Sequence, residues 1–249
     1  MEPVIKVALL SDIHGNHVAL DVVLKAIRAH PVDQIVCLGD VAVDGPGPAR
    51  VIRRLQELDC PVVRGNMDDW AMNPGPPDTG GEDPQRIADV QRWCLSRLSD
   101  EDLACVRTYR PQVTLALADA AKILCVHGSP RSNTEDLAVT TSDANLAERL
   151  GDLRPEIVAS GHTHAAMVRR FEETILVNPG SVGSPSVRML GGRRPCWAEY
   201  AVITWTGEGV SIDLRRCNVD FEVLSGEVHD SGMPHADWWL GRWAAASTM

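Results

Sequence analysis

Seven side chains able to bind metal ions fall into five short motifs between residues 12 and 164. Each motif follows an apolar run that is typical of a β-strand. The motifs are Asp12-Ile13-His14, Gly39-Asp40, Gly65-Asn66, His127-Gly128 and Gly161-His162-Thr163-His164. Strand ends of an α/β sheet present functional groups to a shared crevice. Three carboxylate or amide oxygens and four imidazoles are too many ligands for one ion, so the sequence predicts a hydrolase with two metal ions.

The ligand types also indicate which metals would bind. Imidazole suits Mn, Fe, Zn, Ni and Cu, whereas carboxylate oxygens suit Mg and Mn. The mixed set predicts two divalent metal ions, with Mn first and Fe, Ni or Zn as alternatives. Asp40 offers two oxygens and could bridge both ions, although a lone aspartate of this kind is often an ordinary turn residue. The prediction depends on the five motifs occurring together, because a single His is more often structural.

The first third of the chain alternates strand and helix around these motifs. Apolar runs predict strands at 4–10, 34–38 and 61–64, and amphipathic spacing predicts helices around 20–27 and 51–58. This β-α-β-α-β order implies parallel pairing with right-handed crossovers. Residues 73–84 are rich in Pro, Gly and Asp, which favours a solvated loop over a substrate lid.

The rest of the chain is richer in predicted strands. Helical spacing at 87–98 and a capping box at 99–102 come first, and a helix carrying Leu146 and Leu150 follows later. Strands are expected at 113–117, 122–126, 157–159, 166–171, 174–177, 198–205 and 210–215. Two sheets with helices outside both are the simplest packing of these elements, which makes the fold class α/β.

Composition narrows the class of protein. The formal charge of −10 argues against general nucleic-acid binding, which needs basic contacts to phosphate. It leaves a small phosphoester substrate open, because bound cations invert the local field. Seven scattered cysteines without a CxxC pair favour reduced thiols. No basic leader and no apolar run of ~20 residues is present, so we expect no membrane contact and a cytoplasmic location.

The end of the sequence is unusually aromatic. Residues 237–243 read Asp-Trp-Trp-Leu-Gly-Arg-Trp. We expect residues 1–249 to form a single domain with a Trp-rich C-terminal extension at about 221–249. Packing of this extension onto the chain's own body is favoured over a contact between copies in a homo-oligomer, although Trp is enriched at interfaces.

The order of the motifs resembles that of the calcineurin-like metallophosphoesterase superfamily, whose pattern is D-x-H, G-D, G-N-[H/D/E], H and G-H-x-H. The stretches at 11–16 (Ser-Asp-Ile-His-Gly-Asn) and 178–183 (Asn-Pro-Gly-Ser-Val-Gly) resemble a compact prokaryotic, phosphodiesterase-like branch. The resemblance implies a four-layer αββα sandwich with two central mixed β-sheets. It also implies how the ligands divide: one metal held by Asp12, His14 and His164, the other by Asn66, His127 and His162, with Asp40 between them.

One position departs from the family pattern. Many members have a His after the Gly-Asn pair, where it helps to protonate the leaving group. Here that residue is Met67, whose thioether has no proton to give. Asp68 is the candidate replacement, and Asp69 is a second. The alternative is that both aspartates cap the segment that follows.

Three further side chains are candidates for binding the substrate. Arg131 and Arg188 have the guanidinium geometry that suits phosphate oxygens. His17 lies near the first metal motif, at the start of a predicted helix. Each of the three could instead be an ordinary solvated side chain.

The sequence thus predicts a binuclear-metal-dependent phosphoesterase that hydrolyses a phosphodiester by attack of a metal-bridging water or hydroxide. One alternative is a phosphomonoesterase or dinucleoside polyphosphate hydrolase. A second alternative is a non-catalytic metal-binding interaction scaffold on the same fold. The seven potential ligands count against the scaffold, and the missing His counts slightly for it.

Overall fold

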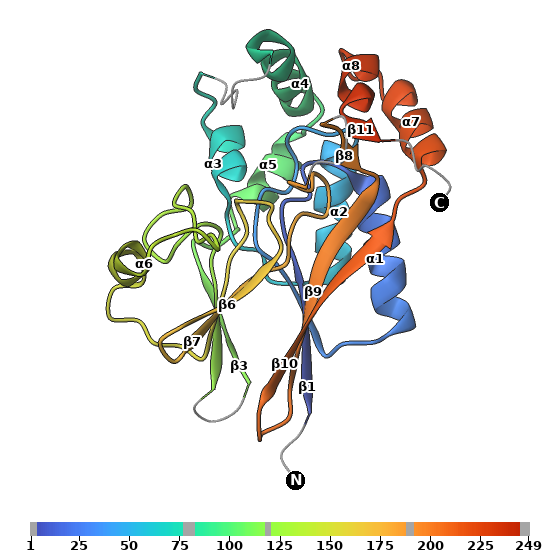
Figure 1. Cartoon of the computed structure of the whole chain (residues 1–249). Coiled ribbons are helices and arrows are strands. Elements are labelled where there is room, and N and C mark those ends of the chain that lie inside the picture. Colours follow the sequence, from blue (N-terminus) through green and yellow to red (C-terminus); the bar gives the residue numbers. More distant parts are fainter. Residues whose placement is uncertain (1–3, 77–82, 118–120, 188–191, 245–249) are drawn as a thin grey trace.

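The computed structural model describes residues 4–76, 83–117, 121–187 and 192–244, and it contains two mixed β-sheets (Figure 1). The first sheet has the order β10 (Val210–Asn218), β9 (Trp197–Trp205), β1 (Ile5–Leu10) and β2 (Gln34–Cys37). Strands β1 and β2 are parallel, whereas β9 is antiparallel to both β1 and β10. The first sheet is therefore mixed, as predicted.

The second sheet has the order β3 (Val113–Ala116), β4 (Lys122–Cys125), β5 (Ile157–Ala159), β7 (Thr174–Asn178) and β6 (Met167–Phe171). Its three central strands are parallel, and the two outer strands pair antiparallel to their neighbours. Both sheets place the carboxyl ends of parallel strands on the same side of the molecule (Figure 1).

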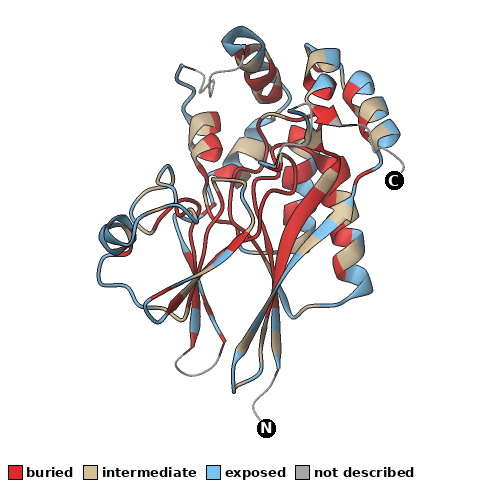
Figure 2. Ribbon diagram, in the orientation of Figure 1, coloured by how far each residue is buried: buried red, intermediate tan, exposed pale blue. Residues whose placement is uncertain are grey.

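Three buried apolar clusters separate four layers. Helices α1 (His17–Ala29) and α2 (Pro48–Leu58) share the first cluster with the outer face of the first sheet. The second cluster lies between the sheets and joins residues such as Leu9 and Ile123. The third lies beneath α6 (Asp143–Leu150), on the outer face of the second sheet. This order confirms the αββα sandwich, and Figure 2 shows the buried strands at its centre.

Further helices lie at the end of the sandwich where the parallel strands finish. Helices α3 (Asn66–Met72), α4 (Pro84–Ser96) and α8 (Ala236–Gly241) stand around this end, with α5 (Asp100–Val106) and α7 (Phe221–Asp230) close by (Figure 1). The predicted capping box opens α5, because Ser99 and Asp102 exchange hydrogen bonds between side chain and backbone. None of the helices in the described ranges has the length and apolar character that crossing a membrane requires.

The prediction of a third strand at 61–64 is wrong. Only two isolated bridges form there, Cys37 to Val62 and Val63 to Arg110. Pro61 has no N–H to donate to a ladder. The chain also turns into α3 directly after Gly65, which leaves too short a segment to form a strand.

The aromatic extension packs onto the body of the chain. Trp239 and Trp243 are buried in the first cluster, and the indole N–H of Trp239 donates to the carbonyl oxygen of Asp44 at 2.8 Å. A two-residue parallel pairing also joins β11 (Trp243–Ala244) to β8 (Arg194–Pro195). This small sheet could not be predicted from the sequence, because two residues are too few to show a period.

Candidate metal centre

The predicted metal ligands gather where the central strands end. Asp12 and His14 follow β1, Asp40 follows β2, His127 follows β4, and His162 and His164 follow β5, whereas Asn66 begins α3. Most of them have a left-handed backbone, with φ of 52° at Asp12, 48° at His14, 54° at Asp40, 65° at His162 and 55° at His164. Such angles are uncommon outside glycine and cluster at functional sites. The sequence motifs did not reveal this strain.

Asp12 is the most deeply buried acid of the group. Its side chain is fully buried, and neither carboxylate oxygen has a hydrogen-bond partner among the described residues. Its closest ion-pair contact joins Oδ1 to Nε2 of His164, at 3.3 Å. An ionised carboxylate without donors is very costly to bury. A cation at this position would remove that cost.

The imidazoles around Asp12 are held in one tautomer by backbone carbonyls. In each ring, Nδ1 donates a hydrogen bond to a backbone carbonyl oxygen. His14 donates to Val43 (3.0 Å), His127 to Leu38 (2.7 Å) and His164 to Ser184 (2.6 Å). Carbonyl oxygens can only accept, so in each neutral ring Nε2 carries a lone pair. Carbonyl contacts of this kind also orient histidines that bind metals.

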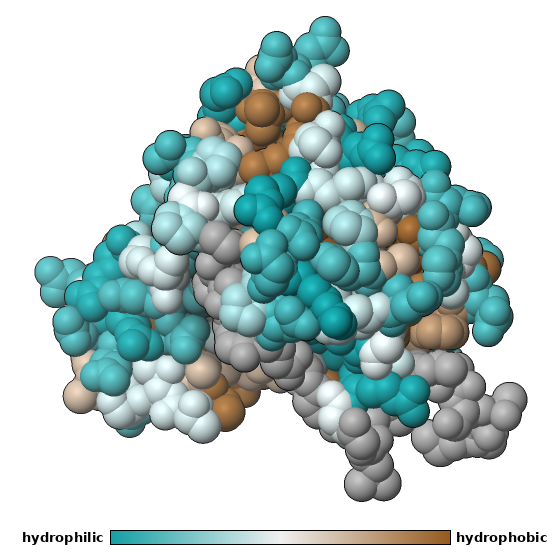
Figure 3. Space-filling model, turned by 90° about the horizontal axis from the view of Figure 1, so that it is seen from above, coloured by the Kyte–Doolittle hydropathy of each residue, from teal (hydrophilic) through white to brown (hydrophobic). Residues whose placement is uncertain are grey.

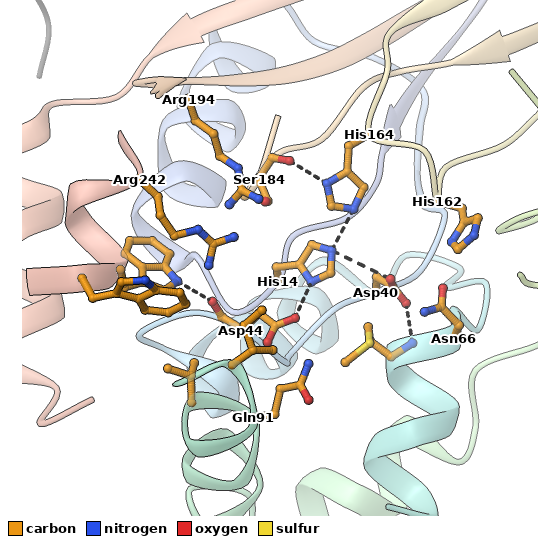
Figure 4. Close-up of a pocket in the computed structure, with 16 residues that line it drawn as sticks. His14, Asp40, Asp44, Asn66, Gln91, His162, His164, Ser184, Arg194 and Arg242 are labelled. Carbon is orange, nitrogen blue, oxygen red and sulfur yellow. Dashed lines mark hydrogen bonds and ion pairs between the residues drawn. The ribbon is translucent and has the colours of Figure 1, made fainter. Parts of the chain in front are cut away.

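Two of these Nε2 atoms, those of His14 and His164, lie only 3.0 Å apart (Figure 4). Two lone pairs at that distance repel each other unless a proton or a metal ion lies between them. The ligand atoms of Asp12, His14 and His164 all lie within 4.8 Å of one another. These three residues therefore fit one divalent cation.

Asp40 lies between this group and a second one. Its Oδ2 is 3.8 Å from Nε2 of His14 and 3.4 Å from Nε2 of His127. On the far side, Oδ1 of Asn66 is 3.0 Å from Nε2 of His127, and the ring of His162 is 5.3 Å from that of His127. Asp12 also groups with Asp40 and His127. The structure thus brings all seven predicted ligands into one cluster.

The acids impose a strongly negative potential on the cluster. Burial would raise the pKa of Asp12, but the imidazoles, His164 first, hold it well below its usual range. Burial opposes protonation of His127, because it disfavours the charged ring, yet Asp40 raises the pKa of His127 to about 10. The pKa of His164 is also raised, against the effect of burial, mainly by Asp12. In the metal-free protein the ring of His127 therefore holds a proton at neutral pH, which a metal ion bound there would replace.

Asp68, the candidate proton donor, contacts backbone amides. Its carboxylate accepts hydrogen bonds from the N–H groups of Asp40 (3.0 Å), Val41 (3.0 Å) and Gly65 (2.8 Å). It is buried and does not line the cavity described below. The geometry therefore offers no support for Asp68 as the acid, and the capping alternative describes its contacts.

Two of the three candidates for substrate binding, Arg131 and His17, are not brought to the cluster. Arg131 forms an ion pair with Glu135 at 2.7 Å, and Nε2 of His17 lies 3.1 Å from Glu227 on α7. Neither Arg131 nor His17 is among the described residues that line the cavity at the metal ligands. Arg188 lies outside the described residues.

A cavity of about 390 Å³ opens directly onto the cluster. Predicted ligands form one end of it (Figure 4). The rest of the lining includes residues that the sequence analysis did not single out as site residues: Asp44, Gln91, Arg194, Trp238, Trp239 and Arg242. The aromatic run at 237–243 was a signal for part of this set, but nothing in the sequence placed it beside the metal motifs. Viewed from above, much of the molecular surface is hydrophilic and apolar side chains form only small patches (Figure 3).

Comparisons with known proteins agree with this geometry. A family model described as the calcineurin-like phosphoesterase superfamily domain matches residues 5–202. An uncharacterized protein of Methanocaldococcus jannaschii is 25% identical over 194 residues, which are 72% of this chain and 76% of that protein. A probable metallophosphoesterase of Methanothermobacter thermautotrophicus is 27% identical over 140 residues, or 46% of this chain and 78% of that protein.

Solved structures share the fold. A metallophosphoesterase from Sphaerobacter thermophilus superposes with a TM-score of 0.73 at 21% identity, covering 96% of this chain and 97% of that one. A hypothetical protein from Pyrococcus horikoshii gives a TM-score of 0.77 at 16% identity, covering 98% and 100%. The matched range includes every predicted metal ligand, and five of these residues form the two groups whose ligand atoms could hold a metal ion. The chain therefore belongs to the calcineurin-like phosphoesterase superfamily, a family of metal-dependent phosphoesterases.

Proposed function

We propose that this protein hydrolyses a phosphodiester with a pair of divalent cations, Mn first. The observation that carries the proposal is the fully buried carboxylate of Asp12, whose oxygens have no hydrogen-bond partner in the part of the chain that the structure describes and which is flanked by imidazoles held with Nε2 towards the cluster. A structural aspartate would have hydrogen-bond donors around it. This one has the surroundings of a metal ligand.

The residues divide as the family resemblance implied. Asp12, His14 and His164 would hold one ion, and Asn66, His127 and His162 the other, with Asp40 between them. Two such ions would activate water for attack and neutralise charge on the phosphoryl oxygens. The protein's own part is to fix the ligands, and it does so through carbonyl contacts to Nδ1 and through Asp68, which holds the backbone of Asp40.

The cavity has room for the organic part of a phosphoester. Besides the predicted ligands, it is lined by Met67, Ile87, Val90 and Trp238. A phosphoryl group alone needs only the ligand end, and the remaining space can take the organic groups on the ester oxygens, of which a monoester has one and a diester two. Met67 stands in the cavity lining, where it can contact such a group but cannot donate a proton to it.

The test compares hydrolysis of bis-p-nitrophenyl phosphate and p-nitrophenyl phosphate by metal-free protein titrated with Mn. We expect turnover to appear as two ions bind, with the larger kcat/KM for the diester. Asp12→Asn should lose ions and turnover, whereas Asp21→Asn, on the exposed face of α1, should keep both. A larger kcat/KM for the monoester would favour a phosphomonoesterase. Two bound ions without turnover of either ester would favour the interaction scaffold.

A further inference from the structure

The segment at 178–184, at the end of β7, is hydrogen-bonded to two of the loops that carry predicted metal ligands. In the loop after β1, the carbonyl oxygen of Asp12 accepts a hydrogen bond from the backbone N–H of Gly183 at 3.0 Å. A side chain at Gly183 would collide with the carbonyl oxygen of Ile13, so the segment and this loop are in close contact. Most of the segment belongs to the stretch at 178–183 that resembles the compact branch of the family, yet it contains none of the predicted ligands.

The hydroxyl group of Ser181 connects two predicted ligands of the same ion. It donates to the carbonyl oxygen of Asp12 at 2.7 Å and accepts a hydrogen bond from the N–H of Ser184, also at 2.7 Å. The carbonyl oxygen of Ser184 in turn accepts the hydrogen bond from Nδ1 of His164 at 2.6 Å (Figure 4). One fully buried side chain therefore holds the backbone of Asp12 and, through Ser184, the imidazole of His164. Both ligands belong to the set assigned to one ion, here the first ion: Asp12, His14 and His164.

The backbone of Asp12 needs such support. Its φ of 52° is uncommon outside glycine, and strained conformations persist only where the surrounding structure holds them. On the imidazole side, Nε2 of His164 lies 3.3 Å from Oδ1 of Asp12 and 3.0 Å from Nε2 of His14, so a small rotation of this ring would change both distances. Groups that orient metal ligands in this way typically contribute about 10–100-fold to metal affinity.

A different set of residues is assigned to the second ion: Asn66, His127 and His162. The hydrogen bonds of the Ser181 hydroxyl to Asp12 and Ser184 do not reach any of these. Asn178, at the other end of the segment, lies closer to the second ion. Its Nδ2 donates to the carbonyl oxygen of Gly161 at 2.6 Å and to Oγ1 of Thr163 at 3.1 Å, on either side of His162. The hydroxyl of Ser181 is thus connected to the first ion alone.

We propose that Ser181 is a positioning residue for the first ion. Its hydroxyl fixes the carboxylate of Asp12 through the backbone and keeps the ring of His164 turned with Nε2 towards the cluster through Ser184. This role rests on the proposed function, because it uses the division of ligands between two ions proposed there. Loss of the hydroxyl should therefore weaken binding of the first ion and spare the second.

Mn binding to variants that each keep one ion tests this selectivity without requiring turnover. Asn66→Ala should keep the first ion and lose the second, and His14→Ala should do the reverse. Titration with Mn, followed by the electron paramagnetic resonance signal of free Mn, gives a dissociation constant for each protein. Adding Ser181→Ala should weaken Mn binding about tenfold or more in the Asn66→Ala protein, and by less than about threefold in the His14→Ala protein.

Thr174→Val is the matched control. The hydroxyl of Thr174 also belongs to a buried residue and donates to the carbonyl oxygen of Pro155 at 2.8 Å, but it lies at the start of β7, at the opposite end of the strand from the segment. Thr174→Val should change Mn affinity by less than about threefold in both single variants, because no predicted ligand depends on this contact. If Ser181→Ala does not fold, Ser181→Cys keeps a weak donor and should give a smaller loss with the same selectivity.

The outcomes separate the role of Ser181 from the proposed function. The role would be overturned by an equal loss in both single variants, by no loss, by the same selective loss in Thr174→Val, or by single variants that bind no Mn. A selective loss in a protein that hydrolyses neither bis-p-nitrophenyl phosphate nor p-nitrophenyl phosphate would overturn the proposed function and leave the role of Ser181 standing. Hydrolysis of the diester with two bound ions and no selective loss would do the reverse.

Discussion

The carboxylate of Asp68 accepts a hydrogen bond from the backbone N–H of Asp40, so one buried acid holds another in place. The same carboxylate also bonds to Val41 and Gly65, which joins the loop after β2 to the start of α3. Asp40 is proposed to bridge the two ions and Asn66 to bind one of them. The positions of both residues therefore depend on Asp68, which contacts neither the cavity nor a predicted ligand atom.

Asp68→Ala should destabilise the fold and weaken metal binding together. The substitution leaves three buried N–H groups without an acceptor, and we expect a loss of about 2–4 kcal/mol in the free energy of unfolding. Asp68→Asn keeps an acceptor oxygen and should lose less. Urea unfolding with parallel metal analysis measures both effects. An Asp68→Ala variant that is as stable as the wild type would show that the three hydrogen bonds are dispensable.

The Asp40→Asn variant should bind fewer metal ions and lose turnover, but its fold should be preserved. The amide oxygen can still accept the hydrogen bond that Oδ1 now accepts from the N–H of Met67 at 2.8 Å. The charge that would bridge two cations is lost, so at least one ion should leave and turnover should fall to background. Elemental analysis and circular dichroism would be compared with Asp21→Asn. Two tightly retained ions in Asp40→Asn would rule out the bridging role.

Metal binding should release protons and become tighter as the pH rises. The pKa of His127 is raised to about 10, so this ring is protonated near pH 7 in the metal-free protein, and the pKa of His164 is also raised, mainly by Asp12 against the effect of burial. A metal ion must displace protons from the rings that it binds. For each proton displaced, the metal affinity should increase by up to about tenfold per unit rise in pH. Titration calorimetry in buffers of different ionisation enthalpy counts the protons. Binding without proton release would contradict this assignment.

The same raised pKa sets how the stability of the metal-free protein varies with pH. A protonated His127 is favoured in the folded state, so its contribution is fully present below about pH 6.5, the ordinary pKa of an unfolded His. That contribution should be lost as the pH rises towards about 10. Thermal unfolding of metal-free protein should show this decline. A His127→Gln variant should lack it, and an identical decline in that variant would assign the effect to another group.

Met67 should make the rate depend on the leaving group. A thioether cannot protonate a departing alkoxide, so nitrophenyl esters should turn over far faster than alkyl esters. General acid catalysis is typically worth ~10²–10⁴-fold, and Met67→His should recover part of that factor for alkyl esters only. The measurement is kcat for both ester types in both proteins at equal metal content. If the wild type shows no such dependence, Asp68→Asn tests whether that carboxylate supplies the proton after all.

The sequence predicted the cluster of potential ligands because six of the seven follow an apolar strand, whereas Asn66 begins α3. Asp12 and His127 stand next to recognisable runs, and parallel pairing brings the ends of such runs together. The rest of the cavity lining follows no such rule. Arg194 and Arg242 meet through a two-residue strand pair, and no periodicity marks a segment that short. The same limit explains the error at 61–64, where apolar residues form bridges and no strand.

The left-handed backbone at the ligands has a consequence for how this protein can change. Glycine adopts such φ angles without steric cost, whereas Asp and His at these positions each carry strain. Replacing His14 or His162 by glycine would relieve that strain and remove a predicted ligand in the same step. Selection for a sturdier fold alone would therefore favour other residues at these positions, so strained Asp and His side chains here indicate a role in function.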